Sequence, residues 1–192
     1  VETVTPLRIG DRVTRVSTIA DIAHKVGRTD ELWFVTVDHE YRTERGVAVR
    51  DRQNIVYREA AKPGTPEKRE ASKDEARAIS TSWTVPTSPV LLFRYSAITF
   101  NGHRIHYDEP YVTGVEGYEG LIVHGPLQAT LLLNLAALQM GSAPARFTYR
   151  GTAPVIAGTD LLVCQGAGES AAKFWTQSPS GQVHMEASAE AA

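Results

Sequence analysis

The residues most able to do chemistry lie in one stretch, where three of the six histidines occur between His103 and His124. An unperturbed imidazole titrates near neutrality, so it can take up and return a proton at physiological pH. Of the three, His106 has the most polar surroundings, which are Asn101, Arg104, Tyr107 and Asp108. A loop that only connects two elements does not need so many polar side chains. We therefore predict that His106 is a general acid and base, with a structural histidine as the alternative.

The second candidate element is the corner formed by His124, Gly125 and Pro126. It opens an apolar run, LIVHGPLQATLLLNLAALQM, that predicts a buried central helix with Pro126 at its first position and Gly141 at its end. The first N–H groups of a helix lack partners and lie at the positive end of its dipole. Because Gly125 has no side chain, a ligand could approach its N–H, which would then polarise a carbonyl group. Ordinary helix punctuation by Gly-Pro is the alternative.

Strands are predicted on both sides of this helix. Alternating and β-branched residues indicate strands at 13–19, 32–41 and 47–57, with turns at Gly10-Asp11 and 27–30. After the helix, similar segments occupy 145–150, 161–166, 171–178 and 182–189. One long helix wrapped by an antiparallel sheet is the hot-dog arrangement. The predicted fold class is therefore α+β, as a tandem (double) hot dog with a degenerate or truncated first half.

The composition divides the chain into three parts. Residues 1–59 are predicted to be the sheet portion of the first hot dog. Residues 60–89 are rich in charges, proline and small residues and predict a linker, with a short surface helix possible at 67–79. Residues 90–192 are predicted to form the second, catalytic hot dog. A three-stranded sheet has an apolar face, and nothing in residues 1–58 covers it. We expect the cover to come from a preceding segment absent from this chain, from the second half, or from another subunit.

The bulk composition excludes several classes of protein. The 20 Lys and Arg residues nearly balance the 22 Asp and Glu residues, which argues against a nucleic-acid-binding surface. The single cysteine, Cys164, fits a core position and a reducing compartment. No run approaches the roughly 18 apolar residues of a membrane span, and no signal-peptide pattern is present. His103 and His106 with Asp108 make a weak metal-binding pattern, and no metal or other cofactor is expected.

Two segments carry a family resemblance, LFRYSAITFNGHRIHYD and EGYEGLIVHGPLQATLLLNL. They resemble the double-hot-dog hydratases and dehydratases of the MaoC-like superfamily. Within that group the chain is similar to itaconyl-CoA and mesaconyl-C4-CoA hydratases and to mitochondrial-type 3-hydroxyacyl-thioester dehydratases. PLRIGDRV, LWFVTVDHEY and QNIVYRE in the first half agree with it. The resemblance implies reversible addition of water across the α,β double bond of an acyl thioester, with coenzyme A as part of the substrate.

The resemblance also implies roles for individual residues. The superfamily motif, Asp-x-Asn-Pro-(Leu/Ile/Val)-His, aligns with the segment from Asn101 to His106 and matches at Ile105 and His106. Asn101 stands in place of the aspartate, and an amide cannot act as a general base. His106 is then the acid and base, with Asn101 orienting a water molecule or Asp108 assisting. The superfamily's oxyanion glycine, at the start of the hot-dog helix, matches Gly125.

The remaining predicted site residues concern the substrate. Arg94 and Arg104 are candidates for binding a substrate carboxylate or a coenzyme A phosphate. The predicted pocket is lined by Tyr95, Tyr118, His124 and Pro126. The leading hypothesis is a hydratase acting on itaconyl-CoA or mesaconyl-C4-CoA, with citramalyl-CoA as product.

Two alternatives to the leading hypothesis remain. One is a 3-hydroxyacyl-thioester dehydratase of fatty-acid synthesis. The other is a non-catalytic acyl-thioester-binding subunit. The resemblance further implies a homo-oligomer, in the cytoplasm or, in a eukaryote, the mitochondrial matrix. Because relatives have an upstream segment with the first hot dog's helix, we expect this chain to be truncated.

Overall fold

The protein, described from a computed structural model, is defined at residues 1–26, 31–58, 77–168 and 172–191. It forms two compact units. The first unit comprises Val1–Ala60, Pro144–Phe147 and Ala191–Ala192, and the second comprises Ala61–Ala143 and Thr148–Glu190. The candidate chemistry of the sequence falls in the second unit.

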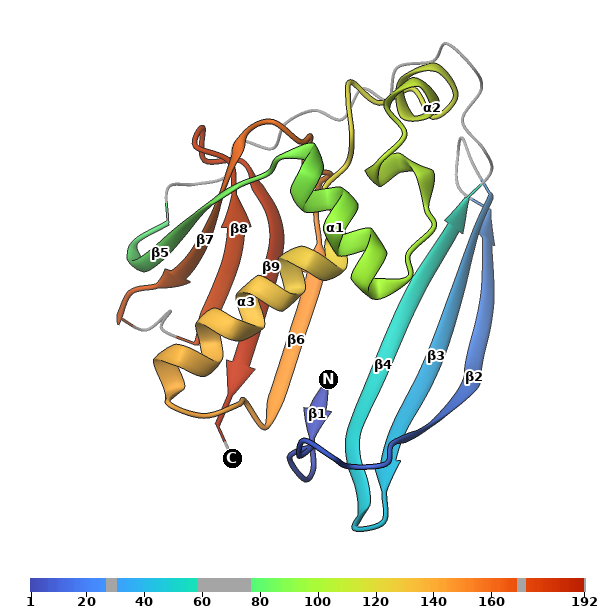
Figure 1. Cartoon of the computed structure of the whole chain (residues 1–192), viewed down its shortest axis with the longest axis vertical. Helices are drawn as coiled ribbons and strands as arrows, with labels where there is room; N and C mark the ends of the chain where they lie inside the picture. The colour runs from blue at the N-terminus through green and yellow to red at the C-terminus, as the bar shows by residue number, and fades with distance from the viewer. Residues whose placement is uncertain (27–30, 59–76, 169–171, 192) are drawn as a thin grey trace. The chain divides into compact units, whose positions relative to one another are not determined.

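The first unit is an antiparallel sheet in the order β2-β3-β4-β1 (Figure 1). Its strands are β1 (Glu2–Thr3), β2 (Thr14–Val26), β3 (Glu31–Thr43) and β4 (Gly46–Arg58). The three long strands occur where the alternating pattern predicts them, although β2 extends well beyond residue 19. Gly46 adopts a φ of +107° at the tight turn into β4, a conformation that glycine tolerates best.

The two faces of this sheet differ in chemistry. Cross-strand partners place Ile19 beside Val37, Ile22 beside Val35, and Trp33 beside Tyr57 on one face. On this apolar face Ile19 is 63% exposed and Ile22 is 56% exposed. The other face carries ion pairs, such as Arg52 with Asp38 at 2.7 Å and Arg50 with Glu40 at 3.4 Å. The described residues of the first unit contain no helix, in agreement with the expectation that residues 1–58 supply no cover.

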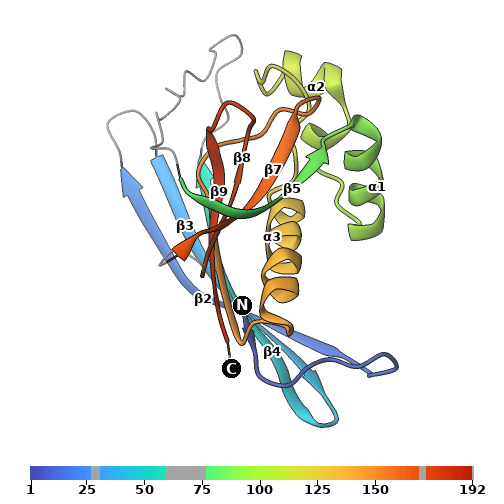
Figure 2. The same cartoon turned by 90° about the vertical axis from the view of Figure 1, so that its left-hand side faces the viewer.

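The second unit packs one long helix on an antiparallel sheet. Helix α3 (Gly125–Met140) lies against β7, β8 and β9 (Figures 1 and 2). The strand order is β6-β9-β8-β7-β5. These strands are β5 (Ile79–Pro86), β6 (Arg146–Gly151, whose first two residues belong to the first unit), β7 (Asp160–Gly166), β8 (Lys173–Gln177) and β9 (Val183–Glu190). The four predicted strands after the helix are confirmed, and Gly141 ends α3 with a φ of +70°.

The core of this unit lies between α3 and the sheet. Leu132 and Leu135 of α3 are fully buried, whereas Leu138 is 65% exposed. The predicted buried central helix is therefore confirmed on the side that packs on the sheet, whereas its C-terminal end is exposed at Leu138. A buried hydrogen bond of 2.6 Å from the Thr176 hydroxyl to the Gln128 side-chain oxygen joins α3 to β8.

The linker prediction is wrong at its C-terminal end. Residues 60–76 lie outside the described residues, together with most of the possible helix at 67–79. Ile79–Pro86, however, form β5 and pair with β7. Thr81, Trp83 and Val85 are each partly buried while their neighbours are exposed, which is the period-2 pattern of a strand. The prolines and charges around this strand obscure that pattern in the sequence.

Three short elements follow β5, and they carry the candidate site. Helix α1 (Pro89–Thr99) is capped by the Ser88 hydroxyl, which accepts the Leu91 N–H at 3.2 Å. It covers the stretch at 95–100 for which the sequence left helix and strand open. A single 3₁₀ turn, η1 (Arg104–His106), and helix α2 (Glu109–Gly114) complete the series.

Candidate active site

His106 is held at the end of η1 by a hydrogen bond that determines its tautomer. Its ring is only 6% exposed, and Nδ1 lies 2.7 Å from the carbonyl oxygen of Ile122. A carbonyl oxygen can only accept, so Nδ1 carries the proton and donates it. In the neutral ring, Nε2 is then the basic nitrogen. Burial lowers the pKa of His106 below its ordinary value of 6.5, against an opposing effect of the Ile122 carbonyl and with a further lowering by His103.

A second buried histidine lies face to face with the first. The rings of His106 and His124 stack with centroids 3.6 Å apart and an interplanar angle of 18°. His124 is fully buried, and its Nε2 lies 2.8 Å from the Ser96 hydroxyl on α1. Burial, together with the nearby His106 and His103, lowers the pKa of His124 to about 4. At neutral pH His124 is therefore uncharged, and His106 is the histidine suited to accept a proton.

The segment that presents Gly125 is tied to the segment that presents His106. The Ile122 N–H donates to the Ile105 carbonyl at 2.9 Å, while the Ile122 carbonyl accepts from the His106 ring. On its other side, the Val123 N–H donates to the Val155 carbonyl at 2.8 Å. These bonds fix the backbone that leads into the first turn of α3. The predicted acid/base residue and the predicted carbonyl-polarising glycine thus lie in one rigid substructure.

No steric requirement within the protein explains the glycine at position 125. A Cβ atom built there would lie 3.9 Å from its nearest neighbour, the Met185 methyl group, which is an ordinary contact distance. Gly125 is the first residue of α3, where N–H groups have no partner within the helix. A ligand that binds a backbone N–H needs free space beside it, and the missing side chain of Gly125 leaves that space.

Asn101 and Asp108 both have structural partners. The Asn101 side-chain oxygen accepts the His103 N–H at 3.0 Å and so shapes the turn before η1. The Asp108 carboxylate accepts from Arg104 at 2.7 and 2.9 Å and from the Tyr111 N–H at 3.1 Å. The hydrogen bonds from Arg104, followed by the Tyr111 N–H, lower the pKa of Asp108. Asp108 is thus poorly suited to take a proton, and the role of Asn101 stays a prediction.

The predicted substrate-binding residues are dispersed. Arg94 is exposed on α1, two residues before Ser96 and so nearly on the opposite side of the helix. Arg104 pairs with Asp108 and lies 4.0 Å above the Tyr111 ring.

The remaining predicted pocket residues lie around α1 and α3. The Tyr95 ring meets the His124 ring edge-on at 4.9 Å, and Tyr118 packs against the apolar core. Pro126 is exposed in the first turn of α3. Tyr95 thus contacts His124, which is itself one of the two stacked histidines.

The sequence interpretation missed two groups that hold the histidines, the Ser96 hydroxyl and the Ile122 carbonyl. Ser96 is 6% exposed and lies one helical turn after the fully buried Leu92. That i, i+4 spacing was a usable signal, because both residues share one face of a helix. The Ile122 carbonyl left no signal, since every residue has a backbone carbonyl.

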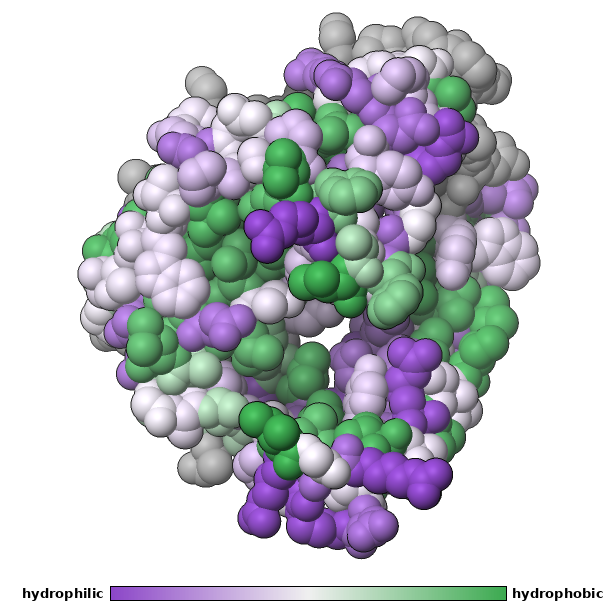
Figure 3. All heavy atoms as spheres, in the orientation of Figure 1, coloured by the Kyte–Doolittle hydropathy of each residue, from purple (hydrophilic) through white to green (hydrophobic). Residues whose placement is uncertain are grey.

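Apolar side chains are exposed on the outer side of α1 and at the end of α3 (Figure 3). Those on α1 include Phe93, which is 61% exposed, Ile98, which is 75% exposed, and its C-cap Phe100, which is 96% exposed. Phe100 also adopts a φ of +53°, which is uncommon for a residue with a large side chain. These residues form an apolar surface on the helix that carries Ser96.

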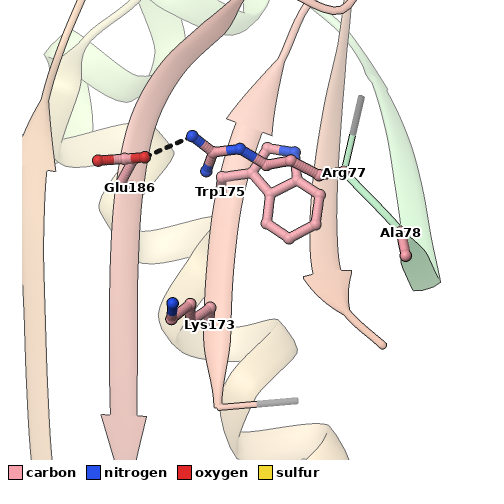
Figure 4. Close-up of a pocket in the computed structure, with 5 residues that line it drawn as sticks. All are labelled: Arg77, Ala78, Lys173, Trp175 and Glu186. Carbon is pink, nitrogen blue, oxygen red and sulfur yellow. Dashed lines mark hydrogen bonds and ion pairs between the residues drawn. The ribbon is translucent and has the colours of Figure 1, made fainter. Parts of the chain in front are cut away.

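A separate hollow of about 320 Å³ lies on the other face of the second unit's sheet (Figure 4). Thr176 contacts α3, so its neighbour Trp175 points to the opposite face. The Arg77 guanidinium lies 5.4 Å from the centre of the Trp175 ring and donates to Glu186 at 2.6 Å. The other lining residues are Ala78 and Lys173, and none of the predicted site residues lines this hollow.

Three further observations concern metal binding, the cysteine and the helices. Within residues 1–26, 31–58, 77–168 and 172–191, no group of three or more His, Cys, Asp or Glu side chains is placed to hold a metal ion. Cys164 is fully buried, and burial raises the pKa of its thiol to about 11. Helices in the same described ranges are all too short or too polar to cross a membrane.

Comparison with solved structures identifies the fold. A MaoC-like dehydratase superposes with a TM-score of 0.72 and 16% identity, over 100% of this chain and 73% of that one. A Mycobacterium tuberculosis protein with a double hotdog fold superposes with a TM-score of 0.62 and 13% identity, over 97% of this chain and 71% of that one. The predicted α+β hot-dog fold is confirmed.

Comparison with known sequences identifies the family. Mesaconyl-C(4)-CoA hydratase from Chloroflexus aurantiacus is 37% identical over 185 residues, which are 96% of this chain and 65% of that protein. The mitochondrial hydroxyacyl-thioester dehydratase type 2 of Schizosaccharomyces pombe is 36% identical over 86 residues, which are 43% of this chain and 29% of that protein. The chain thus spans about two thirds of the first relative and less of the second. The family model for hydroxyacyl-thioester dehydratase type 2 matches residues 1–157, and the chain belongs to that family.

Proposed function

We propose that this chain provides the site of an acyl-CoA hydratase, which adds water reversibly to the α,β double bond of an enoyl thioester. The observation that carries the proposal is the hydrogen bond from His106 Nδ1 to the Ile122 carbonyl. It leaves Nε2 as the basic nitrogen, in a rigid substructure that also contains the start of α3 at Gly125. A base and a carbonyl-polarising N–H are the two groups that this reaction requires.

In the proposed mechanism one histidine handles both proton transfers. The Gly125 N–H donates to the thioester carbonyl oxygen and stabilises the negative charge that develops there. His106 Nε2 removes a proton from water, the water oxygen forms a bond to Cβ, and the double-bond electrons move to the carbonyl oxygen. The protonated His106 then returns its proton to Cα as the carbonyl re-forms. The neutral His124 at its face adds no opposing charge to the imidazolium.

We propose a short dicarboxylyl-CoA, of the itaconyl-CoA or mesaconyl-C4-CoA type, as the substrate, with citramalyl-CoA as the product. Water adds directly across the α,β double bond of mesaconyl-C4-CoA. The double bond of itaconyl-CoA lies one position further from the thioester and first has to shift to α,β, by loss of a proton from Cα and its return to the terminal methylene carbon. The support is the 37% identity with a mesaconyl-C(4)-CoA hydratase. Arg104 is the nearer cation to His106 in sequence, and it would have to exchange Asp108 for the substrate carboxylate. An exposed pair of this kind contributes little stability, so that exchange costs little.

A panel of enoyl-CoA substrates tests both parts of the proposal. Itaconyl-CoA, mesaconyl-C4-CoA and crotonyl-CoA are compared at equal concentration. Hydration of the last two is followed by loss of the absorbance of the conjugated thioester, and hydration of itaconyl-CoA, whose double bond is not conjugated, by chromatographic measurement of the product. We expect the dicarboxylates to be preferred and Arg104→Gln to reduce that preference, while Arg94→Gln serves as the matched control. Binding of every acyl-CoA without hydration of any would instead support the non-catalytic subunit.

A second candidate is a 3-hydroxyacyl-thioester dehydratase of fatty-acid synthesis, which runs the same chemistry towards loss of water. The similarity to the Schizosaccharomyces pombe dehydratase over 86 residues favours it. It predicts that crotonyl-CoA and longer chains without a second carboxylate are the better substrates. The same panel therefore separates the two candidates, because they predict opposite preferences between the dicarboxylyl-CoA substrates and crotonyl-CoA.

A further inference from the structure

Ser96 is a buried polar residue to which the proposed water addition gives no role. It is 6% exposed, and its hydroxyl lies 2.8 Å from His124 Nε2. Serine side chains within helices usually face solvent or bond back to their own helix. This hydroxyl instead reaches from α1 to the residue that precedes α3.

The burial of the His124 side chain costs the folded state some stability. It is fully buried, and its Nδ1 has no hydrogen-bond partner in the described part of the chain. A buried nitrogen without a partner destabilises the folded state. Two contacts of the ring oppose that cost, the hydrogen bond to Ser96 and the stack on His106 at 3.6 Å. An apolar side chain would fill the same space without the unpartnered nitrogen, so filling space does not account for a histidine here.

The orientation of His106 needs more than one contact. The hydrogen bond from Nδ1 to the Ile122 carbonyl fixes one ring nitrogen, but the ring can still turn about that bond. The face of His124, nearly parallel at 18°, blocks that rotation. We propose that Ser96 and His124 are a positioning pair, which holds the His106 imidazole in the plane from which Nε2 reaches both the attacking water and Cα.

The same pair also bears on the carbonyl-polarising group. The peptide group between His124 and Gly125 is planar, so the Gly125 N–H moves with the backbone of His124. By anchoring the His124 side chain to α1, Ser96 fixes the base and the N–H donor relative to each other. Placement of reacting groups at this precision contributes strongly to rate, and small displacements reduce it.

The groups that face His106 determine how its titration should change when the Ser96 hydroxyl is removed. His124 lies on its face, and His103 lies at its edge with centroids 5.5 Å apart. The charged neighbours Arg104 and Asp108 pair with each other. Removing the Ser96 hydroxyl frees the His124 ring and lets water reach His106. Because burial is the main cause of the lowered pKa of His106, that pKa should then rise.

The test compares Ser96→Ala with two other variants of α1. Ser88→Ala removes the N-cap hydrogen bond of the same helix and is the control for lost stability. Ser96→Thr restores a hydroxyl at the critical position. For each protein, kcat and KM for the best enoyl-CoA are measured, and the His106 ring is titrated by NMR. The His106→Gln variant identifies its resonance.

We expect Ser96→Ala to lower kcat about tenfold with KM nearly unchanged, and to raise the titration midpoint of His106. Ser96→Thr should restore both, and Ser88→Ala should change neither. A midpoint and a kcat in Ser96→Ala that match those of Ser88→Ala would overturn the proposal. The inference rests on the proposed role of His106, but the NMR titration needs no substrate. A chain inactive on every substrate would therefore refute the proposed function. The titration midpoint of His106 in Ser96→Ala would still test the positioning pair.

A second pair of variants applies if Ser96→Ala does not fold. His124→Phe keeps an aromatic ring against His106, whereas His124→Leu removes it. The positioning role predicts a raised midpoint for His106 in both variants, with the smaller rise in the first, because the phenyl ring still covers His106 but has no hydrogen bond to Ser96. Equal midpoints in the two variants would contradict it.

Discussion

Substitution of Gly125 by alanine should move stability and activity in opposite directions. The added methyl group would lie 3.9 Å from Met185 and no closer to any other described atom outside its own segment. The steric cost to the folded protein is therefore near zero. Alanine is favoured over glycine within helices by about 1 kcal/mol, and less at their ends. We expect Gly125→Ala to leave the free energy of unfolding unchanged or to raise it by up to about 1 kcal/mol.

The expected effect on catalysis is much larger. If the Gly125 N–H donates to the thioester oxygen, a methyl group on the adjacent Cα obstructs the approach of that oxygen. Loss of one such donor lowers kcat by about 100-fold to 1,000-fold, or roughly 3–4 kcal/mol of transition-state stabilisation. The glycine would then be required by the substrate and not by the fold.

The assay pairs thermal unfolding with hydration kinetics on the same preparations. Gly114→Ala is the matched control, because Gly114 also lies in a helix, a Cβ atom added to it would meet no other atom within 4 Å, and it is remote in sequence from the α3 start. Its activity should equal that of the wild type. A Gly125→Ala protein that folds normally and retains activity within about threefold of the control would refute the assignment of this N–H to the substrate carbonyl.

Four further outcomes are expected. His106→Gln should reduce kcat by about 100-fold to 10,000-fold while acyl-CoA binding, measured by calorimetry, persists; comparable losses of both would refute a purely acid/base role. Because the pKa of His106 is lowered and catalysis needs its neutral form, kcat/KM should fall on the acidic side with a midpoint below 6.5. Asp108→Asn should retain most activity. In the wild type the ionised Asp108 stabilises the fold, and that stability is lost as pH falls through its lowered pKa; the variant should not show this loss. A double-mutant cycle of Arg77→Ala and Glu186→Ala, followed by urea unfolding, should give a coupling below about 1 kcal/mol, because both side chains are well exposed.

The sequence predicts those parts of the molecule that have a local signature. The three long strands of the first unit follow from alternation and from β-branched residues, and α3 follows from its apolar run and from Pro126 and Gly141. His106 and Gly125 could be singled out from residue type and local context. Strand β5 could not, because its period-2 pattern lies within a segment dominated by charge and proline.

Other features depend on tertiary contacts that no local pattern contains. Hydropathy indicates that α3 is apolar, but it does not tell how many layers cover it. The sequence also leaves open which face of α1 carries Arg94 until the boundaries of that helix are known. The link from Ser96 to His124 spans two elements that are 28 residues apart in the chain, and it becomes visible only when α1 and α3 are placed together.

The first unit's sheet has a consequence for handling the protein in solution. Strand β2 is 13 residues long and lies at the end of the strand order, so one row of its N–H and C=O groups has no neighbouring strand among the described residues. The apolar face, with Ile19 and Ile22, adjoins that edge. Long edge strands beside exposed apolar side chains promote pairing between chains. We expect the purified chain to aggregate increasingly with concentration, as followed by light scattering. Either Ile19→Lys or Ile22→Lys should suppress the aggregation without altering the histidine site.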